Sequence, residues 1–101
     1  MLQIVEIEDV CSALSNPTRR QLMSMLITRG PMSSKQAHEA YQREFETYRR
    51  ETIYKSLEKL VSANLLEKKY EKDEGILYVA RVTEIHLDIG DVEIKTVNRE
   101  K

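Results

Sequence analysis

Apolar residues between positions 47 and 66 recur at the spacing of an amphipathic helix. One stripe holds Ile53, Leu57, Leu60, Val61 and Asn64, and a stripe of this kind packs against a core. The opposite side is polar and cationic, with Tyr48, Thr52, Lys55, Lys59 and Ser62. Thr47 is a suitable N-cap, and Glu51 lies in the first turn, where a carboxylate complements the helix dipole. The pattern predicts a helix over residues 47–64 with a basic, polar outer face.

Two shorter helices are expected near the start of the chain. Apolar residues at Val10, Cys11 and Leu14 predict a helix from about residue 8 to residue 16, whereas residues 2–7 fit either a strand or a helix. Pro17 suits the first turn of a second helix, which is expected to run to about Thr28 and to stop at Gly30-Pro31. Its expected buried residues are Leu22, Met25 and Leu26, with Met23 and Ile27 beside them.

A third helix is expected between Ser33 and Glu46. Ser33 and Gln36 fit a capping box, in which each side chain bonds to the backbone N–H of the other residue. The apolar face carries Ala37, Ala40, Tyr41 and Phe45. Small residues at two of these positions allow close approach of another helix.

After Leu66 the apolar period changes from that of a helix to that of a strand. Residues 66–72 alternate, residues 73–75 (Asp-Glu-Gly) suit a turn, and residues 76–82 form a β-branched returning strand. Residues 83–97 alternate again around Gly90-Asp91, which favours a second β segment over a competing short helix. Helices followed by a hairpin directly after a basic helix predict an α+β winged helix-turn-helix fold, with the hairpin 66–82 as its wing.

The length of 101 residues predicts one domain over residues 1–97, with a possible dimerisation segment at 83–97 and a frayed tail at 98–101. The sequence has no apolar run near eighteen residues and no basic-then-apolar leader. We therefore expect no membrane segment and a cytoplasmic location.

The net charge of −1 conceals an uneven distribution along the chain. Residues 17–59 carry nine basic residues against five acidic ones, a balance of +4, whereas residues 1–16 carry −3 and residues 83–101 carry −2. A dipolar protein of this kind can present a positive face to phosphates. A helix with an apolar back and a basic front also fits a DNA major groove.

Two stretches resemble known DNA-binding families. The segment ALSNPTRRQLMSML (13–26) resembles the opening helix pair of ArsR-type winged-helix repressors. The segment ETIYKSLEKLVSANLLEKK (51–69) resembles the recognition helix and first wing strand of ArsR-, PadR- and MarR-type regulators. The resemblance covers about residues 13–82. It implies a DNA-binding transcriptional regulator.

The chain also departs from these families. About six extra residues separate Ala37 from Thr52 relative to ArsR proteins, as in PadR-like proteins, and Glu51 stands where PadR-like sequences often have glycine. The thiolate pair of metal-sensing ArsR members is absent, so we expect no metal. The C-terminal β pattern has no counterpart in families that commonly end in a helix.

Other chemistry is not indicated by the sequence. His38 and His86 lie in no metal-binding motif and are interpreted as structural or solvated. No glycine-rich phosphate loop and no GxSxG motif occurs, so we expect neither catalysis nor a cofactor. The single cysteine, Cys11, is interpreted as a buried structural thiol.

The expected DNA contacts follow from the helix and wing positions. Thr52 and Lys55 are assigned to base edges, with Tyr48 and Lys59 flanking them. Phosphate contacts are assigned to Ser34, Lys35, Arg49 and Arg50, and wing contacts to Lys68, Lys69 and Lys72. Tyr70 and Tyr78 are interpreted as wing-packing residues. Arg19 and Arg20 oppose the dipole of their helix, so contact with DNA or a dimer partner, packing, and an internal salt bridge all stay open.

Taken together, these features predict a sequence-specific regulator of double-stranded DNA, a dimeric repressor. One module of this size buries little surface, so we expect a symmetric homodimer formed through the apolar N-terminal segment, the C-terminal β segment or both. The alternative is a winged-helix module that docks a protein partner in a nucleic-acid complex.

Overall fold

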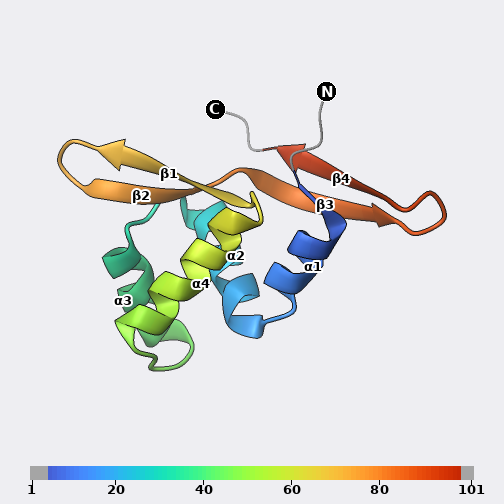
Figure 1. Cartoon of the computed structure of the whole chain (residues 1–101). Helices are drawn as coiled ribbons and strands as arrows, with labels where there is room; N and C mark the ends of the chain where they lie inside the picture. The colour runs from blue at the N-terminus through green and yellow to red at the C-terminus, as the bar shows by residue number, and fades with distance from the viewer. Residues whose placement is uncertain (1–4, 99–101) are drawn as a thin grey trace.

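Residues 5–98 are described by the computed structural model, and they form four helices followed by two antiparallel hairpins (Figure 1). The helices are α1 (Ile7–Leu14), α2 (Pro17–Arg29), α3 (Ser34–Glu44) and α4 (Arg50–Ser62). The strands are β1 (Leu66–Glu71), β2 (Gly75–Ala80), β3 (Val82–Asp88) and β4 (Glu93–Asn98). This order confirms the α+β class and the predicted succession of helices, wing and C-terminal β segment.

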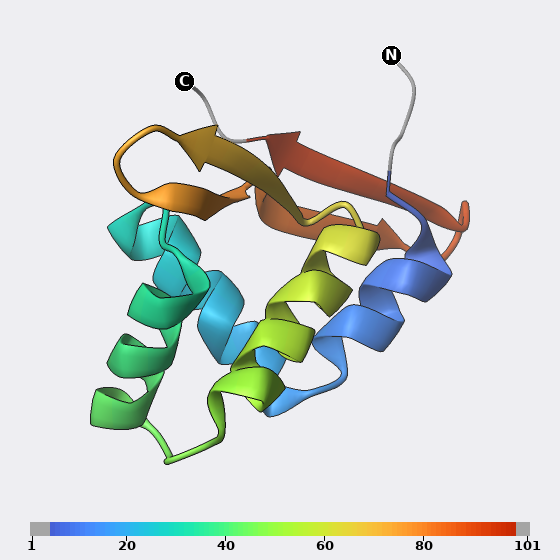
Figure 2. The same cartoon turned by 60° about the vertical axis from the view of Figure 1, so that its left-hand side comes forward.

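The two hairpins extend in opposite directions along one side of the helical layer (Figures 1 and 2). The first, β1–β2, lies above α3 and is called the wing below; the second, β3–β4, lies above α1. No helix in the described part of the chain has the length and apolar character needed to cross a bilayer.

The start of α2 is joined to the end of α1 by side-chain caps. The Asn16 side chain accepts a hydrogen bond from the Arg19 backbone N–H (3.1 Å), and Pro17 occupies the first helical position. Arg19 donates through Nε to the Ala13 carbonyl (2.6 Å), and Arg20 donates through a guanidinium nitrogen to the Leu14 carbonyl (2.6 Å). Both arginines therefore cap the last carbonyls of α1, where a positive charge also suits the helix dipole.

The helix α3 begins and packs as its sequence indicates. Ser33 accepts a hydrogen bond from the Gln36 N–H (3.1 Å), and Gln36 Oε1 accepts one from the Ser33 N–H (2.9 Å), which completes the capping box. Ala37, Ala40 and Tyr41 are buried, as expected. Phe45 is 42% exposed, because α3 ends at Glu44, but its ring still lies 5.0 Å from that of Tyr41.

The helix α4 is shorter than the sequence predicts, running from Arg50 to Ser62 instead of 47 to 64. Thr47 is not its N-cap; Arg49 holds that position, and its side chain makes no capping hydrogen bond. The cause is Tyr48, which is held in an extended loop. Its carbonyl accepts a hydrogen bond from His38 Nε2 (2.7 Å), and its ring stacks on Tyr41 at 5.8 Å. At the other end, Asn64 has a φ of 63°, which ends the helical path.

The core forms where α4 packs between α2 and α3. Ile53, Leu57 and Leu60 are fully buried, whereas Val61 and Asn64 at the margin of the stripe are half-buried. Of the five residues expected from α2, Leu22, Met23, Met25 and Leu26 are buried, and Ile27 is half-buried against the core.

Two other expectations fail. Cys11 is exposed, because the buried stripe of α1 is formed by Val10 and Ala13, and Cys11 lies about 100° away from Val10 around the helix. Asn98 is not frayed: it is the last residue of β4 and pairs with Val82. Val5 is buried and Ile7 packs against the same core, so these two apolar residues fold back on their own domain. Leu2 and Ile4 lie outside the described residues.

The second hairpin has one anchored end and one exposed end. Val82 and Ile94 join the core, and Ile85 packs against it. A turn over residues 89–92 contains the expected Gly90-Asp91 pair, and the apolar residues around it are exposed. Their exposed fractions are 46% for Leu87, 80% for Ile89 and 75% for Val92.

We predict that Leu57→Ala lowers the free energy of unfolding by about 2–5 kcal/mol, because a fully buried leucine is truncated within the core. Lys59→Ala, two residues away on the exposed side, is the matched control and should change stability by less than about 0.5 kcal/mol. Urea denaturation measures both values. Equal effects of the two substitutions would contradict this assignment of the helix faces.

Candidate nucleic-acid interface

The outer face of α4 presents polar side chains to solvent. Thr52, Lys55 and Lys59 are exposed, as expected from the helical period. The ammonium of Lys55 lies 3.8 Å from Glu51 Oε1, one helical turn away, and both side chains are more than 70% exposed. Such a surface pair is weak and leaves the lysine able to exchange its partner for a phosphate or a base.

Both arginines at the start of α4 are exposed. Arg49 precedes the helix and Arg50 is its first residue. No described side chain caps this end. The N–H of Thr52 bonds to the Arg49 carbonyl (3.0 Å), which leaves the backbone N–H groups of Arg50 and Glu51 open among the described residues, beside the two guanidinium groups. Open N–H groups, the positive end of the helix dipole and two arginines together suit an anion such as a DNA phosphate.

The start of α3 lies beside the turn of the wing. Gln36 Nε2 approaches Glu74 Oε1 to 3.4 Å, which brings residues 38 positions apart together. Ser34 is half-buried at the first position of α3, and Lys35 beside it is exposed. The sites predicted on α3 and on the wing are therefore neighbours.

The wing is a regular hairpin in which Leu66 pairs with Ala80, Lys68 with Tyr78 and Tyr70 with Ile76. Lys72 is exposed in the turn, and Lys69 lies 3.8 Å from Glu67. Tyr78 is buried, as expected. Tyr70 is not a packing residue: it is 72% exposed, because it lies near the turn, beyond the point at which Tyr78 holds the wing on the domain.

Tyr78 is held on both its backbone and its side chain. Its N–H and carbonyl pair with the carbonyl and N–H of Met32, at 2.7 and 3.2 Å, in the connection between α2 and α3. Its hydroxyl donates a hydrogen bond to Glu58 Oε2 on α4 at 2.5 Å. Glu58 also accepts from the ammonium of Lys68, which lies 3.2 Å from each carboxylate oxygen.

The hydrogen bond between Tyr78 and Glu58 shifts the pKa of both side chains. The hydrogen bond from Tyr78, aided by Lys68, lowers the pKa of Glu58 below its ordinary value of 4.5, against an opposing effect of burial. Burial, together with the hydrogen bond to Glu58, raises the pKa of Tyr78 well above its ordinary value of 10.0. Glu58 is therefore ionised and Tyr78 protonated at neutral pH, the combination that their hydrogen bond requires.

Of the eleven predicted contacts, Tyr48 differs most from its expected position. It lies on the loop before α4, half-buried, and its hydroxyl donates to Glu46 at 3.0 Å. The other ten residues lie on α4 or directly before it, at the start of α3 or on the wing, and all of them except the half-buried Ser34 are exposed.

Two further residues belong to this surface but are not among the predicted contacts. Tyr54 is 46% exposed on α4, and Glu58 connects α4 to the wing. The helical period could have predicted the exposure of Tyr54, since this residue lies about 100° around the helix from the buried Ile53. The bond to Tyr78 spans twenty residues and has no local signature.

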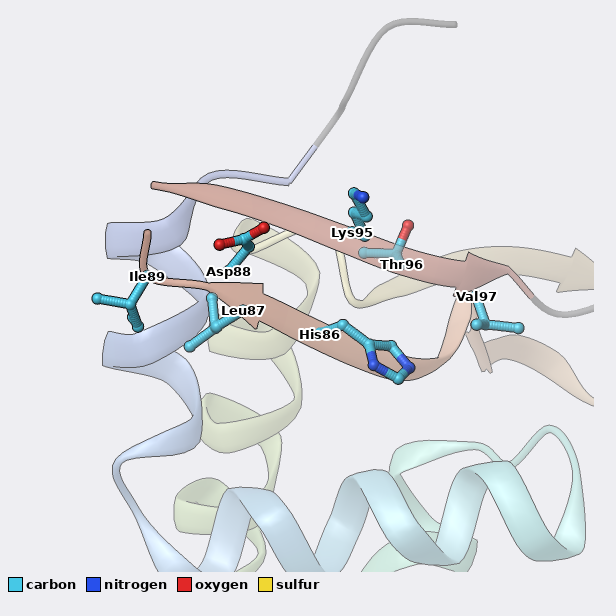
Figure 3. A pocket seen from close by; sticks show the side chains of 7 residues that line it. All are labelled: His86, Leu87, Asp88, Ile89, Lys95, Thr96 and Val97. Carbon is cyan, nitrogen blue, oxygen red and sulfur yellow. The ribbon is translucent and has the colours of Figure 1, made fainter. Parts of the chain in front are cut away.

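A separate hollow of about 490 Å³ lies on the second hairpin (Figure 3). Side chains from β3 and its turn, including His86, Leu87 and Ile89, and from β4, including Lys95 and Thr96, line it. It is open to solvent on a two-stranded sheet and does not reach α4 or the wing. His86 lies 3.4 Å from Glu84, and both are largely exposed.

Comparison with solved structures relates the fold to that of a known regulator. No model of a known protein family matches the chain, and no curated protein matches its sequence. Among solved structures, a ferric uptake regulator from Pseudomonas aeruginosa, determined with manganese, superimposes with a TM-score of 0.61 at 16% sequence identity. The match covers 95% of this chain and 77% of that protein.

This likeness supports the winged-helix fold in general, whereas a closer relation to ArsR-, PadR- or MarR-type regulators stays a prediction. The manganese belongs to the other protein. In residues 5–98 of this chain, no group of three or more His, Cys, Asp or Glu side chains is arranged to hold a metal ion.

Because the pKa of Glu58 is lowered in the folded protein, its interactions stabilise the fold above pH 4.5 and are lost as the pH falls through the lowered value. We predict that Glu58→Gln destabilises the protein at pH 7 and that the difference from the unmodified protein shrinks below pH 4.5. Urea denaturation over this pH range measures both curves. A constant difference across the range would contradict the prediction.

Proposed function

We propose that this protein is a sequence-specific DNA-binding transcriptional regulator that acts as a dimeric repressor in the cytoplasm. The observation that carries the proposal is the winged-helix fold, shared with a ferric uptake regulator, in which α4 presents an exposed polar face. In winged-helix proteins such a helix enters the major groove, which is wide enough for an α-helix. The wing and the start of α3 then flank it.

Thr52 and Lys55 are the proposed base-edge contacts, with Lys59 beside them. They share the face of α4 that points away from Ile53 and Leu57. A lysine can donate to guanine O6 and N7, and threonine can bond to a base edge or pack on a thymine methyl group. Tyr48 is half-buried against Tyr41 on the loop before α4, so it lies beside these contacts and not among them.

The remaining contacts are proposed for the phosphate backbone. Arg49 and Arg50 lie at the open end of α4, and Ser34 and Lys35 begin α3. Contacts of this type position a protein on DNA without reading its sequence. The wing would add phosphate contacts from Lys72 and Lys69. Lys68, the third lysine assigned to the wing, lies nearest to α4, where it pairs with Glu58.

One observation favours a second candidate, a winged-helix module that docks a protein partner. Lys55, Lys68 and Lys69 each lie within 4 Å of a glutamate of the same chain. These acids reduce the positive potential of the surface on which DNA would lie.

Binding to duplex DNA of random sequence separates the two candidates. For a DNA-binding protein, the logarithm of affinity falls against the logarithm of salt concentration by about 0.9 per neutralised phosphate. We predict this steep dependence, measured by fluorescence anisotropy with a labelled duplex. A flat response, or no binding at low salt, favours the protein-docking module.

Three alanine variants locate the contacts within the same experiment. Lys35→Ala should flatten the salt dependence by about 0.9, the contribution of one phosphate. Lys55→Ala should lose about 1–3 kcal/mol of discrimination at one base position, measured by selection from a pool of random duplexes. Arg43→Ala, which removes an exposed cation in the last turn of α3 that is not among the predicted contacts, is the matched control and should change neither quantity.

The dimer is proposed to form through the second hairpin. Leu87, Ile89 and Val92 are large exposed apolar residues near its turn, and Val97 is 44% exposed on β4. Clustered apolar surface of this kind usually marks an interface. A second copy of the chain would also provide the two-fold symmetry with which regulators of this size select a DNA site.

We predict that sedimentation at micromolar concentration reports a dimer and that Ile89→Lys converts it to a monomer by placing a charge in the interface. Ile76→Lys is the matched control, because Ile76 is also exposed beside a hairpin turn, but on the wing. A monomeric unmodified protein, or equal effects of both substitutions, would refute the proposed interface.

A further inference from the structure

Glu58 is an acidic side chain on the helix proposed to face DNA. It lies one turn beyond Lys55, and its side chain is 30% exposed. A carboxylate at such a position repels phosphates, so its presence there calls for a compensating role. The hydrogen bonds of its carboxylate to described residues indicate that role, because they lead to the wing.

The carboxylate of Glu58 joins both strands of the wing to α4. Tyr78 on β2 donates its hydroxyl to one oxygen, and Lys68, the cross-strand partner of Tyr78 on β1, lies equally close to both oxygens. Hydrogen bonds to a charged group are stronger than neutral ones. The backbone of Tyr78 is fixed at the same time by its pairing with Met32.

Beyond Tyr78 and its buried neighbour Leu77, the wing has little support. Tyr70 and Ile76, the next cross-strand pair on the same face of the hairpin, are 72% and 52% exposed. Closer to the turn, the contact between Gln36 and Glu74 is long, at 3.4 Å. The direction in which the wing leaves the domain is therefore set mainly at Tyr78 and the adjacent Leu77.

We propose that Glu58 is a positioning residue that fixes the wing on α4 and holds the ammonium of Lys68 on the protein instead of on a DNA phosphate. The first half of this proposal, that Glu58 fixes the wing, does not depend on the proposed DNA-binding function. The second half, that Glu58 keeps Lys68 away from phosphates, rests on that function. In this arrangement Lys68 contributes no phosphate contact. The sequence-independent attraction of the wing then comes from Lys72 and Lys69.

The first half is tested on the protein without DNA, by hydrogen exchange of backbone amides. Glu58→Gln and Tyr78→Phe should each accelerate exchange of the β1 and β2 amides by at least about tenfold, the size expected for a lost charge-assisted hydrogen bond. The α2 amides, which report global unfolding, should change less. Tyr70→Phe is the matched control, because its hydroxyl lies at an exposed position, and should change neither set. Unchanged protection of the wing in both variants would overturn this half.

The second half is tested by the salt dependence of binding to a random duplex. Lys68→Ala should leave the slope unchanged, whereas Lys72→Ala should flatten it by about 0.9. Glu58→Gln releases Lys68 and should steepen the slope by up to about 0.9, and the double variant E58Q/K68A should return it to the original value. An equal flattening by Lys68→Ala and Lys72→Ala would overturn the shielding of Lys68.

These outcomes distinguish the inference from the proposed function. If the unmodified protein binds no DNA, the proposed function fails and the shielding of Lys68 fails with it. The exchange rates of the wing then decide alone whether Glu58 positions the wing.

Discussion

Ile53, Leu57 and Leu60 lose all contact with solvent when α4 packs against α2 and α3, and this burial determines which side of the helix faces outward. Rotating α4 by one residue, about 100°, would expose part of this stripe and bury a lysine or a threonine. The chain continues directly from the end of α4 through Leu65 and Leu66 into the wing, and both leucines are buried in the same core. The orientation of the helix and the origin of the wing therefore depend on the same hydrophobic contacts.

Features determined by neighbouring residues could be predicted from the sequence. Pro17 began α2, Ser33 and Gln36 formed the capping box, and the change from helical to alternating spacing after Leu66 located the wing. Features determined by distant residues could not. His38 and Tyr41 hold Tyr48 outside α4, and Arg19 and Arg20 turn back to cap α1, so neither arrangement follows from spacing along one element.

The charge of the candidate site likewise depends on contacts between distant residues and does not follow from the sequence. Residues 17–59 carry an excess of four positive charges, but Arg19 and Arg20 are engaged with α1 and Arg29 is paired with Glu44. The cations available near α4 are therefore fewer than the nine basic residues of this stretch suggest. The interface depends on where individual guanidinium and ammonium groups are held, and Glu58 is the clearest example because its partners come from the wing.

The core includes residues from both ends of the described chain. Val5 and Val10 near its start and Val82 and Ile94 in the second hairpin belong to the same buried cluster. The second hairpin is thus part of the folding unit and not an appendage to a helix-and-wing domain. A shortened protein that ended after the wing would lose Val82 and Ile94 from this cluster and leave their apolar neighbours in the core exposed to water.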